Sequence, residues 1–385
     1  MSDKHCVLVT GAAGFVGRNL CAVLGRDAGV DLVRFDVDDP PSVLEDGLTR
    51  AGTVFHLAGV NRPPDPAQFE SGNAGLTAEW CERLAVRHRA PKLILASSVQ
   101  AALDNPYGCS KRGAEDALQR YAARTGAEAV VYRLKNLFGK WCRPNYNSVT
   151  ATFCHSVAHG LPLQISDAAN VVDLTYIDDV VEAFAAETGA PPAEPRFRFA
   201  PELPSRRVTL GELAGLVRSF RAQRTSLLLP DLADPFVQRL YATYLTYLDP
   251  ADYAYDLQVR RDERGSLAEF LKTAGAGQIF VSTTRPGVTR GNHYHDTKTE
   301  KFLVLQGEAL IRLRRIDERA VTEIRVRGAE GRVVDIPPGL THSITNVGAS
   351  ELITLFWASE SFDPAVPDTF AEDVRKNATG IRGRK

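Results

Sequence analysis

The sequence lacks three features that would place it in a broad class at once: an excess of charge of one sign, a long apolar run and paired cysteines. Lys and Arg total 46 against 47 Asp and Glu, for a formal net charge of -1. Such a chain has no field that would draw it to nucleic acid or to an anionic membrane, so small molecules are its expected partners. No stretch reaches the roughly 18 to 20 apolar residues of a spanning helix, and no leader pattern opens the sequence, which together favour the cytoplasm.

The cysteine spacing argues against a disulfide framework, and the absence of an internal repeat argues against a repeat protein. The six cysteines all fall in the first half of the chain, without a Cys-x-x-Cys pair or a framework spacing, so we expect reduced thiols. No internal repeat is found. A length of 385 residues exceeds one ordinary core and predicts two domains.

The first part of the chain alternates short β-rich runs with helical segments, which predicts a Rossmann-like α/β fold with a doubly wound parallel sheet. The expected strands are 6–10, 31–35, 53–57, 92–97 and 129–134, with helices from Gly14 and Pro106. Helices near 209–222 and 232–247 are assigned to a smaller lobe that completes this domain. Ligands of such sheets bind at the carboxyl ends of the strands.

The pattern changes to strands alone in the last third of the chain. Apolar runs at 278–283, 302–305, 309–313, 333–336 and 352–357 are separated by Gly and Pro turns, which predicts an all-β barrel. We therefore expect a first domain at 1–247, a linker at 248–264, a barrel at 265–372 and a mobile basic tail at 373–385.

A glycine-rich segment, Thr10–Gly17, follows the first expected strand and opens a helix. Glycine lets the backbone approach a pyrophosphate, and the helix N-terminus offers unpaired N–H groups with a partial positive charge. This context predicts a dinucleotide site. The residues expected to contact the cofactor are Gly11, Gly14, Phe15, Val16, Gly17, Asp36, Leu57 and Ala58, together with Tyr107 and Lys111.

Asp36 ends the second expected strand. A carboxylate there can accept hydrogen bonds from the adenosine ribose and would repel a 2′-phosphate, which favours NADH over NADPH. Two alternatives stay open: Asp36 is a solvated loop acid, or Arg34 reaches a phosphate.

Ser98, Tyr107 and Lys111 form a candidate catalytic set for ketone reduction. Tyr107 and Lys111 are four residues apart on one helix face, and Ser98 ends the preceding strand. The Tyr107 phenol can protonate the developing alkoxide, the Lys111 ammonium can make that phenol more acidic and hold the nicotinamide ribose, and Ser98 can bind the substrate oxygen.

These residues, with Asn73, the run from Arg133 to Gly139 and Tyr176–Asp179, resemble the extended short-chain dehydrogenase/reductase family over about residues 4 to 245. The resemblance implies catalytic Ser98, Tyr107 and Lys111, a nucleotide-sugar substrate, and Asn136 and Asn147 near its diphosphate. Sugar 4,6-dehydratases of the family carry an Asp-Glu pair where this chain has Val99 and Gln100, so dehydration is not expected. Both 4-reduction with NADH or NADPH and 4-epimerisation with a retained cofactor remain open.

Two further motifs lie in the expected barrel with the spacings Gly-x5-His-x-His-x4-Glu-x6-Gly, from Gly287, and Gly-x5-Pro-x-Gly-x2-His-x3-Asn, from Gly331. They are the two cupin motifs without gap or substitution. Alternation along strands would aim the side chains of His293, His295, Glu300 and His342 at one point. Three imidazoles and a carboxylate suit Zn, Fe, Mn or Ni, and fusion to a sugar reductase favours a Lewis acid such as Zn.

The two predicted sites act on one substrate in a coherent way. The C3 proton of a 4-keto sugar is acidified by the adjacent carbonyl, and a metal there would favour its loss and return on the other face, which inverts C3. Reduction at C4 would then trap the product. Lys301 and Tyr294 are the candidate proton carriers, although either side chain can instead be packed or solvated.

From end to end, the chain resembles the bifunctional capsular polysaccharide enzymes of the CapF type. The residues that carry this likeness are 61–63, 104–108, 136–142, 144–149 and 298–304. It implies a homodimer that epimerises C3 of a UDP-2-acetamido-2,6-dideoxy-4-keto-hexose and reduces C4, giving UDP-2-acetamido-2,6-dideoxy-L-talose. Two residues depart from this pattern: Asp36 argues against the NADPH associated with the family, and Tyr294 stands where Trp is expected. The alternatives are a 4-reductase or 4-epimerase with a non-catalytic cupin, or with an oxygen-using iron cupin.

Overall fold

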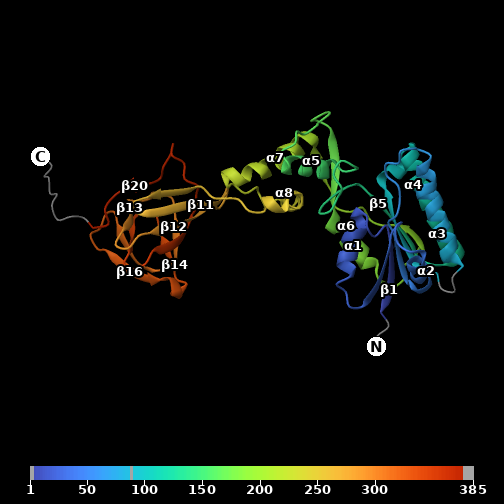
Figure 1. Cartoon of the computed structure of the whole chain (residues 1–385), viewed down its shortest axis with the longest axis horizontal. Coiled ribbons are helices and arrows are strands. Elements are labelled where there is room, and N and C mark those ends of the chain that lie inside the picture. Colours follow the sequence, from blue (N-terminus) through green and yellow to red (C-terminus); the bar gives the residue numbers. More distant parts are fainter. Residues whose placement is uncertain (1–3, 87–89, 376–385) are drawn as a thin grey trace. The chain divides into compact units, whose positions relative to one another are not determined.

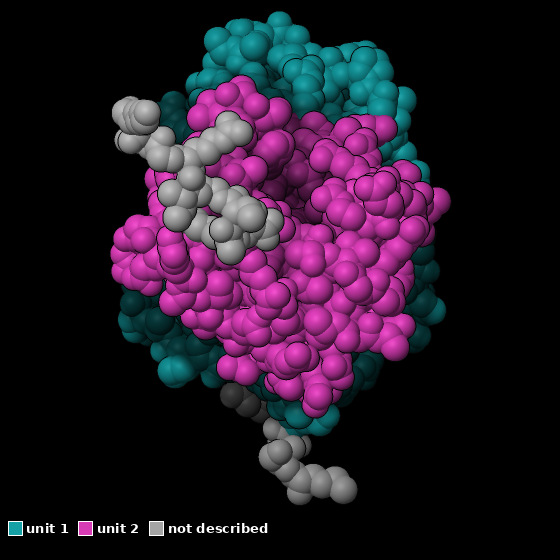
Figure 2. All heavy atoms as spheres, turned by 90° about the vertical axis from the view of Figure 1, so that its left-hand side faces the viewer, with its two compact units in different colours: residues 1–218, 235–249 teal, residues 219–234, 250–385 magenta. Residues whose placement is uncertain are grey.

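The computed structural model describes residues 4–86 and 90–375, which fall into two compact units (Figure 1, Figure 2). Unit 1 takes in residues up to 218 together with 235–249, and unit 2 takes in 219–234 and residues from 250 onward. Within the described residues no helix has the length and apolar character needed to cross a membrane.

A six-stranded parallel sheet forms the centre of unit 1, in the order β2-β1-β3-β4-β5-β8 (Figure 1). Its strands are β1 (His5–Thr10), β2 (Val30–Phe35), β3 (Thr53–His56), β4 (Lys92–Ser98), β5 (Ala129–Leu134) and β8 (Phe197–Phe199). Because β1 lies between β2 and β3, the chain reverses its direction of winding there. Open α/β sheets bind ligands at the carboxyl ends of strands at such a switch point.

Helices cover both faces of this sheet, which explains why its strands are continuous apolar runs. One face packs against α1 (Phe15–Leu24) and α6 (Ile177–Glu187), around a core that includes Val7, Phe55 and Phe184. The other face packs against α2 (Pro41–Arg50), α3 (Leu76–Ala85) and α4 (Pro106–Thr125), around a second core. Two short helices, η1 (Glu70–Gly75) and η2 (Val99–Ala102), precede α3 and α4.

A smaller lobe follows β5. Its three-stranded sheet pairs β6 (Asn136–Phe138) in parallel with β7 (Val171–Tyr176), and β7 antiparallel with β9 (Arg206–Thr209). Its helices are α5 (Val149–Ala158), α7 (Leu210–Ser226) and α8 (Pro235–Leu245). The predicted helices near 209–222 and 232–247 correspond to α7 and α8, and α7 runs across the boundary between the two units.

Unit 2 consists of two antiparallel sheets around one apolar core. One sheet has the order β10-β11-β12-β19-β14-β17 and the other has the order β16-β15-β18-β13-β20. The strands are β10 (Val259–Asp262), β11 (Gly265–Thr273), β12 (Gly277–Thr284), β13 (Thr289–Tyr294), β14 (Glu300–Gln306), β15 (Glu308–Arg315), β16 (Thr322–Arg327), β17 (Val333–Ile336), β18 (Leu340–Asn346), β19 (Leu352–Ala358) and β20 (Phe370–Ala371). The predicted fold class, a parallel α/β sheet followed by an all-β unit, is confirmed.

The segments at the ends of the expected barrel carry more structure than the sequence suggests. β10 lies within the predicted linker and pairs with β11. In the predicted tail at 373–385, Val374 is only 1% exposed and its carbonyl accepts a hydrogen bond from Arg314. The rest of that tail, from 376, lies outside the described residues.

Candidate functional site

The backbone at Gly11, in the loop between β1 and α1, and at Gly17, in the first turns of α1, is packed too closely to accommodate a side chain. Gly11 has φ +66°, and a Cβ atom there would lie 2.7 Å from the backbone nitrogen of Ala58, at the end of β3. A Cβ atom on Gly17 would lie 2.1 Å from the carbonyl oxygen of Gly11. The loop therefore keeps its backbone exposed at the switch point, where the start of α1 can receive a pyrophosphate.

Asp36 lies at this loop. Its Oδ2 accepts the Ala13 N–H at 2.8 Å, and its Oδ1 accepts the Val37 N–H at 2.9 Å. The carboxylate is thus held at the carboxyl end of β2, beside the glycine-rich loop. The Arg34 side chain is exposed on β2.

Ser98, Tyr107 and Lys111 come together at the carboxyl ends of the strands. Ser98 ends β4 and accepts the Gln100 N–H at 3.2 Å, and Tyr107 lies in the first turn of α4. The Tyr107 hydroxyl donates to Asn61 Oδ1 at 3.0 Å. Lys111 Nζ donates to the Ala96 carbonyl at 3.2 Å and lies 5.9 Å from the centre of the Tyr107 ring.

Burial changes the acidity of both groups that would handle a proton. Burial raises the pKa of Tyr107, and a hydrogen bond with Ser98 opposes this rise. Burial lowers the pKa of Lys111 to about 8, against the attraction of Glu115. A lysine with so low a pKa beside a half-buried phenol is typical of a proton-transfer site.

Glu115 is a supporting residue that the sequence analysis missed. It lies one turn after Lys111 on α4 and is buried, where it accepts from Ser97 Oγ at 2.6 Å and from Arg133 at 2.6 and 2.9 Å. This network joins α4 to the ends of β4 and β5. The spacing of four residues from Lys111 was the sequence signal for it.

A cavity of about 290 Å³ opens near the ends of β4, β5 and β8. Its lining includes Val99, next to Ser98, together with Arg133, Lys135, Phe199 and Glu202. Asn136 and Asn147 are exposed: Asn136 begins β6, and Asn147 precedes the start of α5. Neither belongs to the lining of this cavity.

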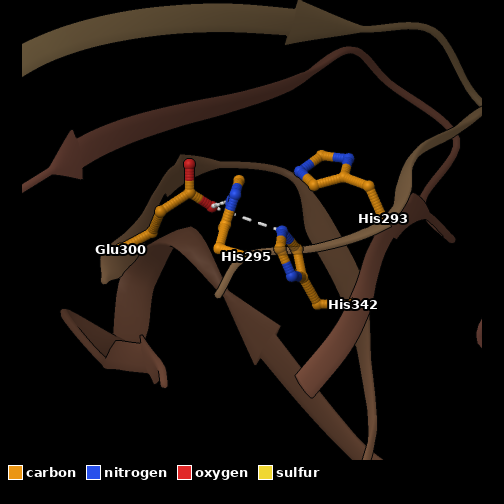
Figure 3. A group of neighbouring side chains, drawn as sticks. All are labelled: His293, His295, Glu300 and His342. Atoms are coloured by element: carbon orange, nitrogen blue, oxygen red, sulfur yellow. Dashed lines mark ion pairs between the residues drawn. The ribbon is translucent and has the colours of Figure 1, made fainter. Parts of the chain in front are cut away.

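In unit 2, the four predicted metal ligands converge (Figure 3). His293 lies on β13, His295 directly after it, Glu300 at the start of β14 and His342 on β18. One potential ligand atom from each residue lies within 4.8 Å of all the others. Figure 3 shows the carboxylate of Glu300 and the three imidazole rings directed toward a common point.

Two of the imidazoles are oriented by carbonyl groups. His295 Nδ1 is hydrogen-bonded to the Asp368 carbonyl, and His342 Nδ1 lies 3.2 Å from the Leu340 carbonyl. Their Nε2 atoms are buried and, among the described residues, make no hydrogen bond with a protein group, although each lies near Glu300 Oε2, at 3.5 and 3.2 Å. Unprotonated Nε2 atoms held beside a carboxylate fit a divalent transition metal.

Two members of the cluster, Glu300 and His293, have pKa values shifted toward the forms that bind metal, whereas burial lowers the pKa of His295 but is outweighed by contacts with Glu300 and the Asp368 carbonyl, which raise it. Burial raises the pKa of Glu300, but the neighbouring imidazoles of His295 and His342 outweigh this and lower it to about 2. Burial, with the neighbouring His342 and His295, lowers the pKa of His293 to about 4. The carboxylate is therefore ionised and His293 is neutral at neutral pH, the states in which both coordinate metal.

Lys301 does not join this cluster, which corrects the expectation that it could carry a proton there. Alternation along β14 directs Glu300 inward and Lys301 outward, where Lys301 is exposed and pairs with Asp335. Tyr294, the other candidate, stacks on Phe370 with ring centres 5.2 Å apart. The buried lysine is instead Lys298, whose Nζ lies 3.5 Å from Glu360 and 3.4 Å from the Asp368 carbonyl.

Comparison with known proteins identifies relatives of both units. Residues 7–194 match the NAD dependent epimerase/dehydratase family, and residues 260–370 match the polysaccharide biosynthesis C-terminal domain. The chain is 43% identical over 375 residues to the UDP-2-acetamido-2,6-beta-L-arabino-hexul-4-ose reductase of Pseudomonas aeruginosa, covering 97% of this chain and 100% of that protein.

Solved structures give the same assignment over nearly the whole length. The crystal structure of the capsular polysaccharide assembling protein CapF from Staphylococcus aureus matches with a TM-score of 0.87 and 41% identity, covering 95% of this chain and 99% of that one. A structure of CapF with the inhibitor 3-isopropenyl-tropolone matches with a TM-score of 0.83 and 37% identity, covering 96% and 99%.

Proposed function

The chain belongs to the CapF type of capsular polysaccharide enzymes, and on that premise we propose that it carries out two reactions on one nucleotide sugar. Unit 1 reduces the C4 carbonyl of a UDP-2-acetamido-2,6-dideoxy-4-keto-hexose with a nicotinamide cofactor. Unit 2 inverts C3 of the same sugar before that reduction. The full-length similarity to a UDP-sugar reductase supports the reduction at C4. The four converging ligand residues support the inversion at C3.

The reduction needs an acid at the C4 oxygen, and Tyr107 is suited to that role. When bound, the nicotinamide supplies the hydride. The Tyr107 hydroxyl, which now donates to Asn61, would donate to the substrate oxygen instead and pass its proton to the alkoxide. The Ser98 hydroxyl would hydrogen-bond the same oxygen, and the Lys111 ammonium would stabilise the phenolate that remains.

The choice of cofactor follows from Asp36, for which we propose a preference for NADH. Its carboxylate lies beside the glycine-rich loop, where it can bind ribose hydroxyls and repel a 2′-phosphate. Comparison of kcat/KM with NADH and NADPH, with Asp36→Ala as the control, tests this assignment. A strong preference of the unmutated enzyme for NADPH would contradict it.

His293, His295, Glu300 and His342 would hold a divalent metal, which we propose is Zn²⁺. When bound, such an ion supplies a Lewis acid that favours negative charge on a keto sugar as its C3 proton leaves. A tropolone carries adjacent carbonyl and hydroxyl oxygens that can chelate a divalent cation, and a tropolone inhibits a relative 37% identical to this chain.

Epimerisation also needs one group that takes the C3 proton and one that returns a proton, and Lys298 replaces Lys301 as the candidate that returns it, because an ammonium can donate a proton. Its ammonium is buried between Glu360 and the Asp368 carbonyl, in the turn between the ligands His295 and Glu300. Tyr294 is the second candidate. The C3–H bond breaks toward one carrier, and the new C3–H bond forms on the opposite face of the sugar.

Heavy water separates the two reactions. The protein is incubated with the UDP-4-keto sugar in D2O without reduced cofactor, and C3 is followed by NMR. We expect deuterium at C3 with the unmutated enzyme and with Tyr107→Phe, but not with His293→Ala. On addition of NADH, Tyr107→Phe should lose reduction by a factor of about 100 or more.

The same experiment discriminates the alternatives. Loss of both exchange and reduction in Tyr107→Phe would refute two separate sites. Full reduction without any C3 exchange in the unmutated enzyme would leave a 4-reductase whose second unit is not catalytic. Oxygen consumption by an iron-loaded enzyme would indicate a dioxygenase instead.

A further inference from the structure

A segment near the end of the described chain crosses unit 2 beside the metal ligands. We call residues 368–374 the C-terminal strap. Its strand β20 pairs with β13, with Ala371 opposite His293 and Phe370 opposite Tyr294. The Glu372 N–H donates to the Asn292 carbonyl at 2.9 Å, so the strap extends the sheet that carries two of the ligands.

The Asp368 carboxylate fixes the turn that follows His295. Its two oxygens accept the backbone N–H groups of residues 296, 297 and 298 at 2.8, 2.9 and 2.8 Å. The Thr297 hydroxyl donates to it at 2.9 Å. Burial opposes ionisation, but these four hydrogen bonds outweigh it and hold the pKa of Asp368 well below its usual range. A charged carboxylate on successive N–H groups is a strong, directional anchor.

The backbone of the same residue orients the ligand itself. The Asp368 carbonyl is hydrogen-bonded to His295 Nδ1, which places the proton on Nδ1 and the lone pair on Nε2. That Nε2 is buried at the cluster and lies 3.5 Å from Glu300 Oε2. His342 is oriented differently, by the Leu340 carbonyl of its own strand. Of these two imidazoles, His295 is the one that is hydrogen-bonded to the strap.

The strap is itself held by a buried arginine. Arg314 on β15 is only 1% exposed. Its guanidinium donates to the carbonyls of Asp373 and Val374 at 3.0 and 2.9 Å and to the carboxylate of Glu372 at 2.5 Å. The strap therefore has two anchors, the Asp368 carboxylate near the ligands and the Arg314 network beyond them.

We propose that Asp368 is a positioning residue for the metal centre: its carboxylate anchors the strap so that its carbonyl keeps His295 in the ligand tautomer and orientation. This inference rests on the proposed function, because it requires that the four-residue cluster binds a metal. Partners of metal-bound histidines typically contribute about 10- to 100-fold to metal affinity. Loss of the Asp368 carboxylate should cost an amount in that range.

The test measures metal binding rather than turnover. The full-length protein is stripped of metal and titrated with Zn²⁺ against a chromophoric chelator, and the visible spectrum of the Co²⁺ form is recorded. Asp368→Ala should bind Zn²⁺ about 10- to 100-fold more weakly, with altered Co²⁺ bands. Asp368→Asn, which keeps one acceptor oxygen, should lie between Asp368→Ala and the unmutated protein.

A matched control comes from the segment just before the strap. Asp363 also accepts a backbone N–H, from Ala365 at 2.8 Å, whereas the hydrogen bonds to the 296–298 turn described above come from Asp368. Asp363→Ala should leave Zn²⁺ affinity unchanged. Thermal unfolding of the metal-free proteins reports general damage to unit 2, and Asp368→Asn keeps the test valid if Asp368→Ala folds poorly.

The possible failures are distinguishable. Zn²⁺ affinity and Co²⁺ bands in both Asp368 variants equal to those of the unmutated protein would overturn the positioning role while leaving the metal centre intact. Equal weakening in Asp363→Ala would also overturn it, because the effect would then be general. An unmutated protein that binds no divalent metal would instead refute the proposed function of unit 2.

Discussion

Lys111 is a buried ammonium at the site of unit 1, and its burial carries a thermodynamic cost. Burial lowers its pKa from 10.5 to about 8. Below pH 8 both the folded and the unfolded chain carry the proton, so the full cost of burying the charge is present. Between about pH 8 and 10.5 the unfolded chain binds more protons than the folded one, and stability therefore rises with pH through this window.

Lys111→Met should remove this dependence. We expect the cofactor-free variant to gain stability over the unmutated protein at pH 7, and this gain to shrink toward pH 10 by an amount on the order of 3 kcal/mol, since one pKa unit corresponds to about 1.4 kcal/mol. Urea unfolding at both pH values measures the difference, with Lys4→Met, an exposed lysine of the same unit, as control. If the difference in stability between Lys111→Met and the unmutated protein did not change with pH, the lowered pKa of Lys111 would be contradicted.

At the residue scale, functional residues that belong to a spaced sequence motif were predicted, whereas residues that reach the site only through tertiary contacts were not. The structure brings together His293, His295, Glu300 and His342, because the intervals between them match strand alternation and turn lengths. Lys301 was a poor candidate on the same logic, since a residue adjacent to an inward-facing Glu300 must face outward. Lys298 and Asp368 could not be predicted, because they contact each other from segments that are 70 residues apart in the sequence.

At the scale of the element, the start of α4 positions Tyr107. Gly108, in the first turn of α4, packs against η2 so tightly that a Cβ atom would lie 2.2 Å from the Gln100 carbonyl and 2.6 Å from the Leu103 carbonyl. Asn105 caps the helix by accepting the Gly108 N–H at 2.8 Å. Any side chain at 108 must therefore displace the first turn of α4.

Gly108→Ala should lower the kcat of reduction on the order of 100-fold, because misplacing an acid by about 1 Å has that effect. Gly215→Ala is the matched control: Gly215 is exposed on α7, and no described atom lies within 4 Å of a Cβ there. It should leave kcat unchanged and stabilise its helix by up to about 1 kcal/mol. Normal kcat in Gly108→Ala would show that the first turn tolerates displacement.

Elements with strong periodic signals were predicted well, and elements defined by pairing were not. Strands β1 to β5 of the parallel sheet match their predicted ranges within one residue, because they are bounded by turns and covered on both faces, whereas β8 was not predicted. β10 is exposed at every position and contains no apolar run, so it gives no strand signal. β20 has two residues and forms only through its contact with β13.

At the scale of the whole molecule, each unit has its own core, so removal of a metal should affect one unit only. A tightly bound ligand stabilises the folded state by about 4 kcal/mol at a concentration 1,000 times its Kd. Chelation by dipicolinate should therefore lower the unfolding temperature of unit 2 and stop C3 exchange, while unit 1 continues to reduce, with NADH, a 4-keto sugar that is supplied with C3 already inverted. Calorimetry and the two activity assays measure these effects.

His293→Ala is the control for chelation, because it lacks a ligand before the chelator is added. Its unfolding should not respond to dipicolinate, and added Zn²⁺ should restore the unmutated protein but not this variant. A chelator that stopped reduction of the already inverted sugar as strongly as C3 exchange would show that the two activities share one metal-dependent site.

The division of the chain between the units was not predictable from composition. The sequence suggested one linker at 248–264, but residues 219–234 cluster with unit 2 while 235–249 return to unit 1. Two backbone hydrogen bonds join residues 219–234 to unit 2. The Leu229 N–H donates to the Lys272 carbonyl and the Lys272 N–H donates to the Leu227 carbonyl, each at 2.8 Å. Such pairing leaves no trace in the hydrophobic pattern of either segment.

That exchange limits how the molecule can be divided into fragments. A polypeptide that begins at residue 250 would carry every metal ligand, yet it would lack the segment that pairs with Lys272 at the margin of β11. The uncovered backbone groups there would be open to pairing with other copies, a recognised route to aggregation. A separately expressed fragment of unit 2 therefore needs residues 219–234 as well, for example fused through a short linker ahead of residue 250.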